Sequence, residues 1–302
     1  MSPAPSTDYG TDDARAFAHF VAGLFAERTG RADVAGDLYT AAIRLDSDYH
    51  KALNNRGFLM QADGAAAYVK RDDARARRLL EDSAGLVARA KVLEDVAEYH
   101  YNYATTLSYL GYLDLRADDR GRARSRQLAS IAAYKEALRA IDKEIAETLA
   151  KQRWWRPRRR AALEKLRTER EGFKRSIQLA LAISCVLARQ LDDKTDPLPE
   201  EKAALDDVFA AFAGTSRLVS HPKLEYNLAC YYAVTKQWDQ AVSLFVKLRS
   251  VTPDLAKQVL ADPDVADLPQ IVALFVPKTA EPVVATPAPS DPKDNPERDE
   301  PT

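Results

Sequence analysis

The sequence has few of the residues on which catalytic, metal-binding and disulfide-stabilised proteins depend. Its 302 residues include 2 cysteines and 4 histidines. Two cysteines are too few for a disulfide framework or a zinc cluster, and no two histidines have the i, i+4 spacing that places metal ligands on one helix face. No glycine-rich phosphate loop follows a strand. The sequence therefore predicts a protein that is not an enzyme and that needs no metal or other cofactor.

Charge of one sign and long apolar runs are also missing. Lys and Arg number 44 against 45 Asp and Glu, a formal net charge of -1, so no overall field attracts nucleic acid or lipid. The longest apolar run, residues 177–187, is too short to cross a bilayer, and the N-terminus lacks the pattern of a secretion signal. Cys185 and Cys230 lie in apolar helical runs, which suits a reducing compartment. We expect a cytoplasmic protein without a transmembrane segment.

Helical periodicity is what the sequence does contain. Residues 224–253 divide into two short amphipathic helices with a polar break at 235–237, because apolar residues recur at spacings of three and four on each side of it. Pro253 ends the second helix. A helix pair this short cannot bury both of its apolar faces alone, so the pattern predicts similar pairs stacked against it.

This stretch resembles the tetratricopeptide repeat, a helix-turn-helix unit of 34 residues. The resemblance is carried by the small, aromatic and proline positions of the family, which are Leu228, Ala229, Tyr232, Ala241, Phe245 and Pro253. The stretch departs from the family at Lys236, where a turn glycine is usual, and at Leu248, where a small residue is usual. A second match centres on Gly23, and Gly57 follows it after one period of 34 residues. The resemblance implies an all-α solenoid that binds other proteins.

The repeats predict the following organisation. Residues 1–12 are a disordered lead, 13–145 hold N-terminal repeats, 221–276 hold a C-terminal repeat with capping helices, and 277–302 are a disordered proline-rich tail. The period slips twice, which predicts insertions in the turns at about 62–71 and 116–127. Residues 146–220 form a divergent helical segment, either eroded repeats or an insert. The solenoid is therefore expected to be irregular in its middle.

Asparagine stands at the same repeat position three times, at Asn55, Asn102 and Asn227. By resemblance, first helices line the concave groove of such a solenoid, where an asparagine amide can bind the backbone of an extended peptide. The other interpretation is a hydrogen bond to a neighbouring helix. Phe20 and Leu24 occupy groove positions of the first repeat and predict an apolar entrance. These five residues are the predicted site for a peptide or a partner helix.

A basic and aromatic stretch is the second candidate surface. Its residues are Arg153, Trp154, Trp155, Arg156, Arg158, Arg159 and Arg160. Tryptophans could stack on bases or lie among lipid headgroups while arginines bind phosphates. Arginines also pair with acidic groups, so an internal or solvated role and an acidic protein partner remain open. By contrast, Asp262, Asp264 and Asp267 are interpreted as solvated carboxylates at a helix end.

The sequence thus favours a non-catalytic adaptor, scaffold or regulatory subunit that binds a protein segment in its groove. The alternative is binding of nucleic acid or an anionic membrane surface through residues 153–160.

Overall fold

The computed structural model describes residues 10–152, 157–213, 222–251, 259–260 and 262–275. This part of the chain contains eleven labelled α-helices and no strand, which confirms the prediction of an all-α helical solenoid. The helices are α1 (Ala14–Arg28), α2 (Ala32–Leu45), α3 (His50–Val69), α4 (Asp73–Leu93), α5 (Ala97–Arg116), α6 (Arg120–Gln152), α7 (Pro157–Leu191), α8 (Pro199–Ala213), α9 (Pro222–Val234), α10 (Trp238–Val251) and α12 (Pro269–Phe275).

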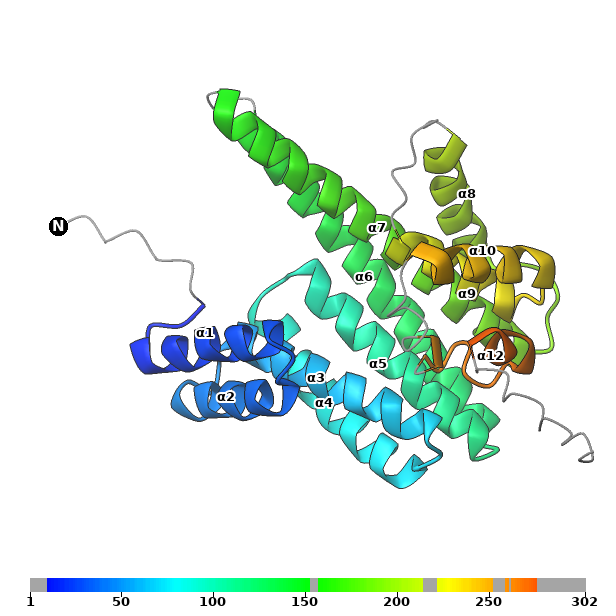
Figure 1. Cartoon of the computed structure of the whole chain (residues 1–302), viewed down its shortest axis with the longest axis horizontal. Helices are drawn as coiled ribbons and strands as arrows, with labels where there is room; N and C mark the ends of the chain where they lie inside the picture. The colour runs from blue at the N-terminus through cyan, green and yellow to red at the C-terminus, as the bar shows by residue number, and fades with distance from the viewer. Residues whose placement is uncertain (1–9, 153–156, 214–221, 252–258, 261, 276–302) are drawn as a thin grey trace, which may run out of the picture.

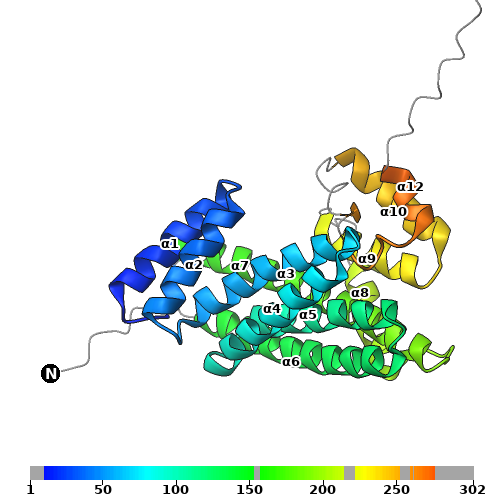
Figure 2. The same ribbon diagram turned by 90° about the horizontal axis from the view of Figure 1, so that it is seen from below.

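Most helices pack against the next helix in the chain. The pairs α1–α2, α3–α4, α5–α6 and α9–α10 are each joined by a turn of three residues. The first helices also contact one another across pairs, α3 with α5 and α5 with α7. Figures 1 and 2 show α1 and α2 at one end of the stack and α9, α10 and α12 at the other. The chain is therefore a row of helix pairs in which each pair covers part of the next.

The turns between paired helices share one backbone conformation. Each has a residue with positive φ, between 60° and 76°, at Gly30, Arg71, Asp118 and Lys236, and Asp193 in the connection after α7 has φ 55°. The amide of the following residue then donates to a carbonyl five residues back, as Gln237 does to Tyr232 at 2.8 Å. This is the Schellman ending of a helix, which normally takes glycine at the left-handed position. Only the turn between α1 and α2 has glycine at this position. Glycine in the sequence therefore indicates one of these turns and not the others.

Small residues allow close contact within the pairs. A β-carbon on Gly23 would lie 2.5 Å from the ring of Tyr39, and one on Gly57 would lie 2.5 Å from Val87. The two glycines are those that are one repeat period apart in the sequence. Ala229 and Ala241 are fully buried between α9 and α10.

The two predicted turn insertions are wrong. The turns comprise only residues 70–72 and 117–119, and the additional residues lengthen the helices on both sides. α3 has 20 residues and α4 has 21, against 15 and 14 in α1 and α2. Two turns of helix span about seven residues and return to the same face, so Ala65 and Tyr68 remain buried in the longer α3.

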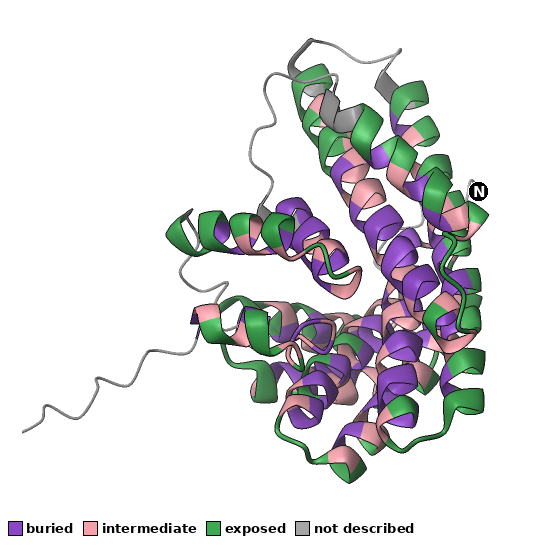
Figure 3. Cartoon of the chain, turned by 90° about the vertical axis from the view of Figure 1, so that its right-hand side faces the viewer, coloured by how far each residue is buried: buried purple, intermediate pink, exposed green. Residues whose placement is uncertain are grey.

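The longest helices, α6 and α7, form a hairpin. They have 33 and 35 residues, and Figure 1 shows their far ends extending beyond the rest of the molecule. The predicted boundary at residue 146 falls inside α6. Pro157 occupies the first position of α7, where its missing N–H breaks no hydrogen bond. Figure 3 shows that buried residues dominate the base of the hairpin and exposed residues its outer part.

The C-terminal helices close the other end of the stack. Val259, Val265, Ile271 and Phe275 are buried in one cluster with residues of α9 and α10. The predicted disordered segments, apart from residues 10–12 at the first, lie outside the described residues.

Candidate functional site

The segment that precedes α12 lies across helices from the distant N-terminal half. Tyr68 of α3 donates to Asp267 at 3.0 Å, and Tyr112 of α5 donates to Asp264 at 2.5 Å. Arg71 and Arg116 each form an ion pair with Asp267, at 2.7 and 3.1 Å. The aspartates therefore bind side chains of the solenoid, which corrects the prediction that they are merely solvated.

Arg116 is the centre of this contact. Its guanidinium lies 3.5 Å from the centroid of the Tyr68 ring, donates to the Tyr68 carbonyl at 2.9 Å and pairs with Asp73 at 2.5 Å. Its side chain is 15% exposed. Arginine suits this position because its planar group can stack on a ring and still donate at its edge.

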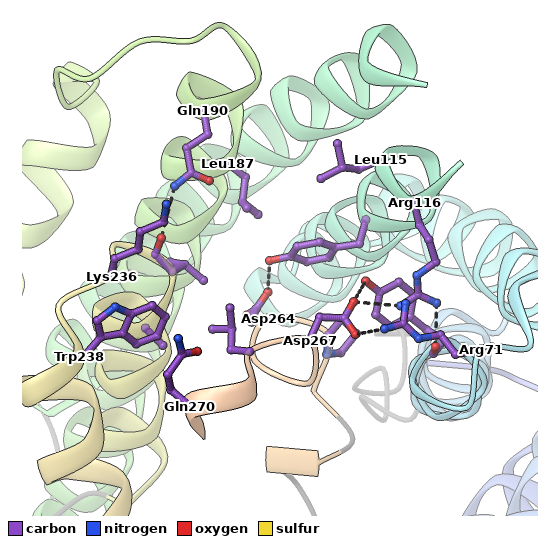
Figure 4. Close-up of a pocket in the computed structure, with 16 residues that line it drawn as sticks. Arg71, Leu115, Arg116, Leu187, Gln190, Lys236, Trp238, Asp264, Asp267 and Gln270 are labelled. Carbon is purple, nitrogen blue, oxygen red and sulfur yellow. Dashed lines mark hydrogen bonds and ion pairs between the residues drawn. The ribbon is translucent and has the colours of Figure 1, made fainter. Parts of the chain in front are cut away.

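A cavity of about 750 Å³ opens beside the segment, and we call it the docking cavity. Its walls come from the ends of α3 and α5, from α7, from the α9–α10 turn and from residues 263–270. Figure 4 shows Trp238 and Lys236 on the opposite side from Arg71, Arg116 and Asp267. Leu115 and Leu187 add apolar surface, and Gln190 and Gln270 add amides.

Two residues that line the docking cavity, Lys236 and Leu115, are exposed. Lys236 is exposed and holds a left-handed backbone with φ 63°. Leu115 is 43% exposed. Trp238, which also lines the docking cavity, is half-buried, so part of the apolar surface at this cavity is not covered by the protein itself.

A second, smaller cavity adjoins Asp264 on the other side, and we call it the tyrosine cavity. Its volume is about 110 Å³. It is lined by Tyr101, Thr105, Ser108, Tyr109, Tyr134, Ala180, Ile183, Ser184, Tyr226, Asn227, Asp262 and Asp264. Tyr226 donates to Asp262 at 2.6 Å, and the Asp264 amide donates to Asp262 at 2.9 Å.

Burial raises the pKa of both carboxyl groups in the tyrosine cavity, and the charge of Asp262 further raises the pKa of Asp264. Burial also places the pKa of Tyr109, Tyr112, Tyr134 and Tyr226 well above that of free tyrosine. For Asp264 the pKa is raised to about 8, so this carboxyl group can exchange a proton near neutral pH. Perturbed carboxyl groups in a cavity are a frequent mark of a functional site.

The predicted groove residues do not form one surface. Leu24 and Asn55 line a third hollow of about 310 Å³ with Glu27, Arg28, Phe58 and Glu98. Asn55 also donates to the Tyr39 hydroxyl at 3.3 Å. Asn227 lines the tyrosine cavity instead.

Phe20 and Asn102 are buried, which corrects their predicted contact with a peptide. Phe20 is 8% exposed and packs on Tyr39 and Tyr49. Asn102 is 3% exposed and donates to Asn54 at 3.0 Å, joining α5 to α3. The interpretation of asparagine as a bond between neighbouring helices is the right one at Asn102, because a polar group at a helix contact must find its partner there.

The basic stretch falls largely outside the described residues. This applies to Arg153, Trp154, Trp155 and Arg156, and to the side chains of Arg158 and Arg159 in α7. Arg160 is exposed.

Tyr68, Tyr112 and Arg116 were missed by sequence reasoning. They lie on helices whose periodicity indicates only packing, and their partners are far away in the chain, 199 residues for Tyr68 and Asp267. In the sequence, the aspartates between residues 262 and 267 were the signal that could have indicated this contact.

Comparison with known proteins does not assign the chain to a family. No family model matches the sequence, and no curated protein matches it. Within the described residues, no cluster of His, Cys, Asp and Glu has the geometry of a metal site. None of the helices, over the same residues, has the length and apolar character needed to span a membrane.

Proposed function

We propose that this chain is a non-catalytic protein-interaction module, an adaptor, scaffold or regulatory subunit, that binds an extended segment of a partner protein at the docking cavity. The observation that carries the proposal is the binding of the chain's own non-helical segment beside that cavity. There, tyrosine hydroxyls and two arginines of the solenoid hold Asp264 and Asp267 of a stretch that forms turns. The docking cavity beside this segment offers apolar and amide groups to a similar segment of another protein.

The chemistry of the docking cavity fits a peptide with an apolar anchor. Its volume of about 750 Å³ lies in the range of ligand sites, about 300–1,000 Å³. Trp238, Leu115 and Leu187 can contact an apolar side chain, and the amides of Gln190 and Gln270 can bind peptide backbone. The resemblance to tetratricopeptide repeats supports the same function. We place the protein in the cytoplasm, because Cys185 and Cys230 are free thiols.

A matched pair of substitutions tests this function. Leu115→Asp places a charge in the docking cavity, whereas Leu128→Asp makes the same change on α6 at a residue that lines none of the three cavities described above. The two leucines are 43% and 41% exposed, so neither change should lower the melting temperature by more than a few degrees. In affinity purification from the source cell, we expect Leu115→Asp to reduce partner capture at least tenfold and Leu128→Asp to leave it unchanged. Equal capture by both variants would contradict the proposal.

A second candidate function rests on the α6–α7 hairpin, which extends from the molecule (Figure 1). Arg158, Arg159 and Arg160 of the basic stretch belong to the first turn of α7, at the far end of this hairpin; residues 153–156 lie outside the described residues. Such a position suits contact with nucleic acid or an anionic membrane, and binding of that kind falls steeply with salt. Capture that survives Leu115→Asp but is lost at high salt would favour the hairpin.

A further inference from the structure

The tyrosine cavity combines features that seldom serve packing alone. Its polar groups include the carboxylates of Asp262 and Asp264, which keep part of their surface exposed. Four tyrosine rings surround them, from α5, α6 and α9. Asn227 and Tyr109, both half-buried, also line the cavity.

The two carboxylates have no counter-ion. Asp267, three residues further on, pairs with two arginines. Over the described part of the chain, no Lys or Arg lies within 4.0 Å of Asp262 or Asp264. Asp262 accepts from Tyr226 on one oxygen and from the Asp264 backbone amide on the other, and Asp264 accepts from Tyr112 on one oxygen. None of these donors carries a positive charge. Because no cation lies beside these two acidic groups, burial and mutual repulsion raise their pKa, and a bound cation would favour their charged forms.

We propose that the tyrosine cavity binds an alkylammonium group between its tyrosine rings and the carboxylates of Asp262 and Asp264. An ammonium ion is attracted both to carboxylates and to the faces of aromatic rings. The volume of about 110 Å³ equals roughly four water molecules at about 30 Å³ each, enough for an ammonium group and its adjacent methylenes. The amide oxygen of Asn227 can accept one N–H.

The ammonium group can come from two sources. It is either the end of a lysine side chain in a partner segment or a small free amine. The first source rests on the proposed function, because Asp264 lines both cavities and one segment could place an apolar side chain in the docking cavity and a lysine in its neighbour. The second source does not depend on that function.

Binding should release protons. The groups that face the two carboxyls are Tyr101, Tyr109 and Tyr112 from α5, Tyr134 from α6, and Tyr226 and Cys230 from α9; the α7 residues of the wall, Ala180, Ile183 and Ser184, carry no charge. Burial raises the pKa of the tyrosines and of Cys230. The carboxyls, whose pKa is also raised, therefore lose the protons when a cation arrives, and affinity increases with pH.

The test is calorimetric titration of the full chain with three probes: n-butylammonium chloride, the peptide acetyl-Gly-Lys-Gly-amide, and the same peptide acetylated on its lysine nitrogen. We expect the first two to bind and the third to bind at least tenfold more weakly. Comparison of buffers with different ionisation heats should show proton release. A lysine peptide that binds at least tenfold more tightly than butylammonium identifies a partner segment as the source, and the reverse order identifies a free amine.

Variants complete the test. In Asp262→Asn with Asp264→Asn, each amide oxygen still accepts from its tyrosine, so the fold is kept while the charge is removed. Affinity for butylammonium should fall at least tenfold, and Asp206→Asn, an exposed aspartate on α8, should change nothing. Equal binding of the acetylated peptide, or unchanged affinity in the double variant, overturns the proposal. The probe comparison uses the wild-type chain and decides the matter even if the double variant does not fold. The outcome of the probe comparison also does not depend on whether Leu115→Asp captures the partner, so the two proposals can fail separately.

Discussion

Gly57 lies where α3 meets α4, and Val87 fills the space that a β-carbon would need. Ser83 of α4 donates to the Gly57 carbonyl at 2.8 Å and shares a contact of 3.3 Å with Thr106 of α5. This position therefore links three helices through short contacts that a larger residue would separate. Gly85, on the same helix α4, is open instead: a β-carbon added there would have no heavy atom of another residue within 4 Å, its immediate neighbours and the backbone of its own helix aside.

These two glycines predict opposite effects of the same substitution. Gly57→Ala forces Val87 or the helix to shift, and overpacking of this kind costs about 1–3 kcal/mol. Gly85→Ala removes backbone freedom from the unfolded chain at an open helix position and should stabilise by roughly 0.5–1 kcal/mol. Urea unfolding followed by circular dichroism measures both. A stabilising Gly57→Ala would show that the contact between α3 and α4 is looser than described.

At the scale of elements, the helix pairs are linked by one type of turn that is made with different residues. Arg71, Asp118 and Lys236 hold the left-handed conformation that glycine adopts freely. A non-glycine residue in this region costs on the order of 1 kcal/mol. Lys236 lines the docking cavity, so its backbone strain coincides with the candidate site.

We therefore expect Asp118→Gly and Lys236→Gly to stabilise the protein by roughly 0.5–1 kcal/mol each. Glycine removes the backbone strain of the folded state, and its greater conformational freedom in the unfolded chain offsets part of that gain. Thermal unfolding of each variant checks this. Asp118 does not line the docking cavity, although its amide donates to the carbonyl of Leu115, which does. It is therefore the control for the Lys236 side chain: only Lys236→Gly should weaken partner capture. A lower melting temperature for either variant would mean that its side chain stabilises the turn more than the conformation costs.

At the scale of the molecule, the C-terminal segment ties the last helix pair to the middle of the stack. Asp267 binds α3 and α5 and the turn after α3, while Val265 and Ile271 are buried against α9 and α10. Arg116 is the residue with the most contacts at this junction. It also forms one wall of the docking cavity.

Arg116→Ala should loosen the segment without unfolding the solenoid. The change removes the ion pairs with Asp73 and Asp267 and the stack on Tyr68. The negative charge of Asp267 is then less completely neutralised. We expect hydrogen exchange at the amides of residues 265–272 to accelerate at least tenfold, with no change in α1 and α2. Arg15→Ala, which removes an exposed pair with Asp13 at 3.5 Å, is the control. Unchanged exchange would show that apolar contacts alone hold the segment.

Helix type and pairing followed from the sequence, because both depend on short-range patterns. The apolar periodicity of residues 224–253, the small residues Ala229 and Ala241, and the spacing of Gly23 and Gly57 lie within one or two repeats. Pro199, Glu200 and Glu201 lie in the first turn of α8, which spans Pro199–Ala213, and proline and acidic residues favour the start of a helix. Turn lengths were less accessible, since two additional helical turns leave the apolar pattern of α3 and α4 in phase.

The two cavities were decided by the tertiary structure alone. Asp264 and Tyr112 are 152 residues apart, and no local pattern distinguishes a carboxylate that will be buried from one that will be solvated. The same applies to Asn102 and Asn55, which occupy equivalent repeat positions but differ in burial. By itself the sequence determined that the chain forms stacked helix pairs, because each helix must cover its apolar face. Where the C-terminal segment lies, and hence which polar groups it encloses, depends on the contacts of the whole stack.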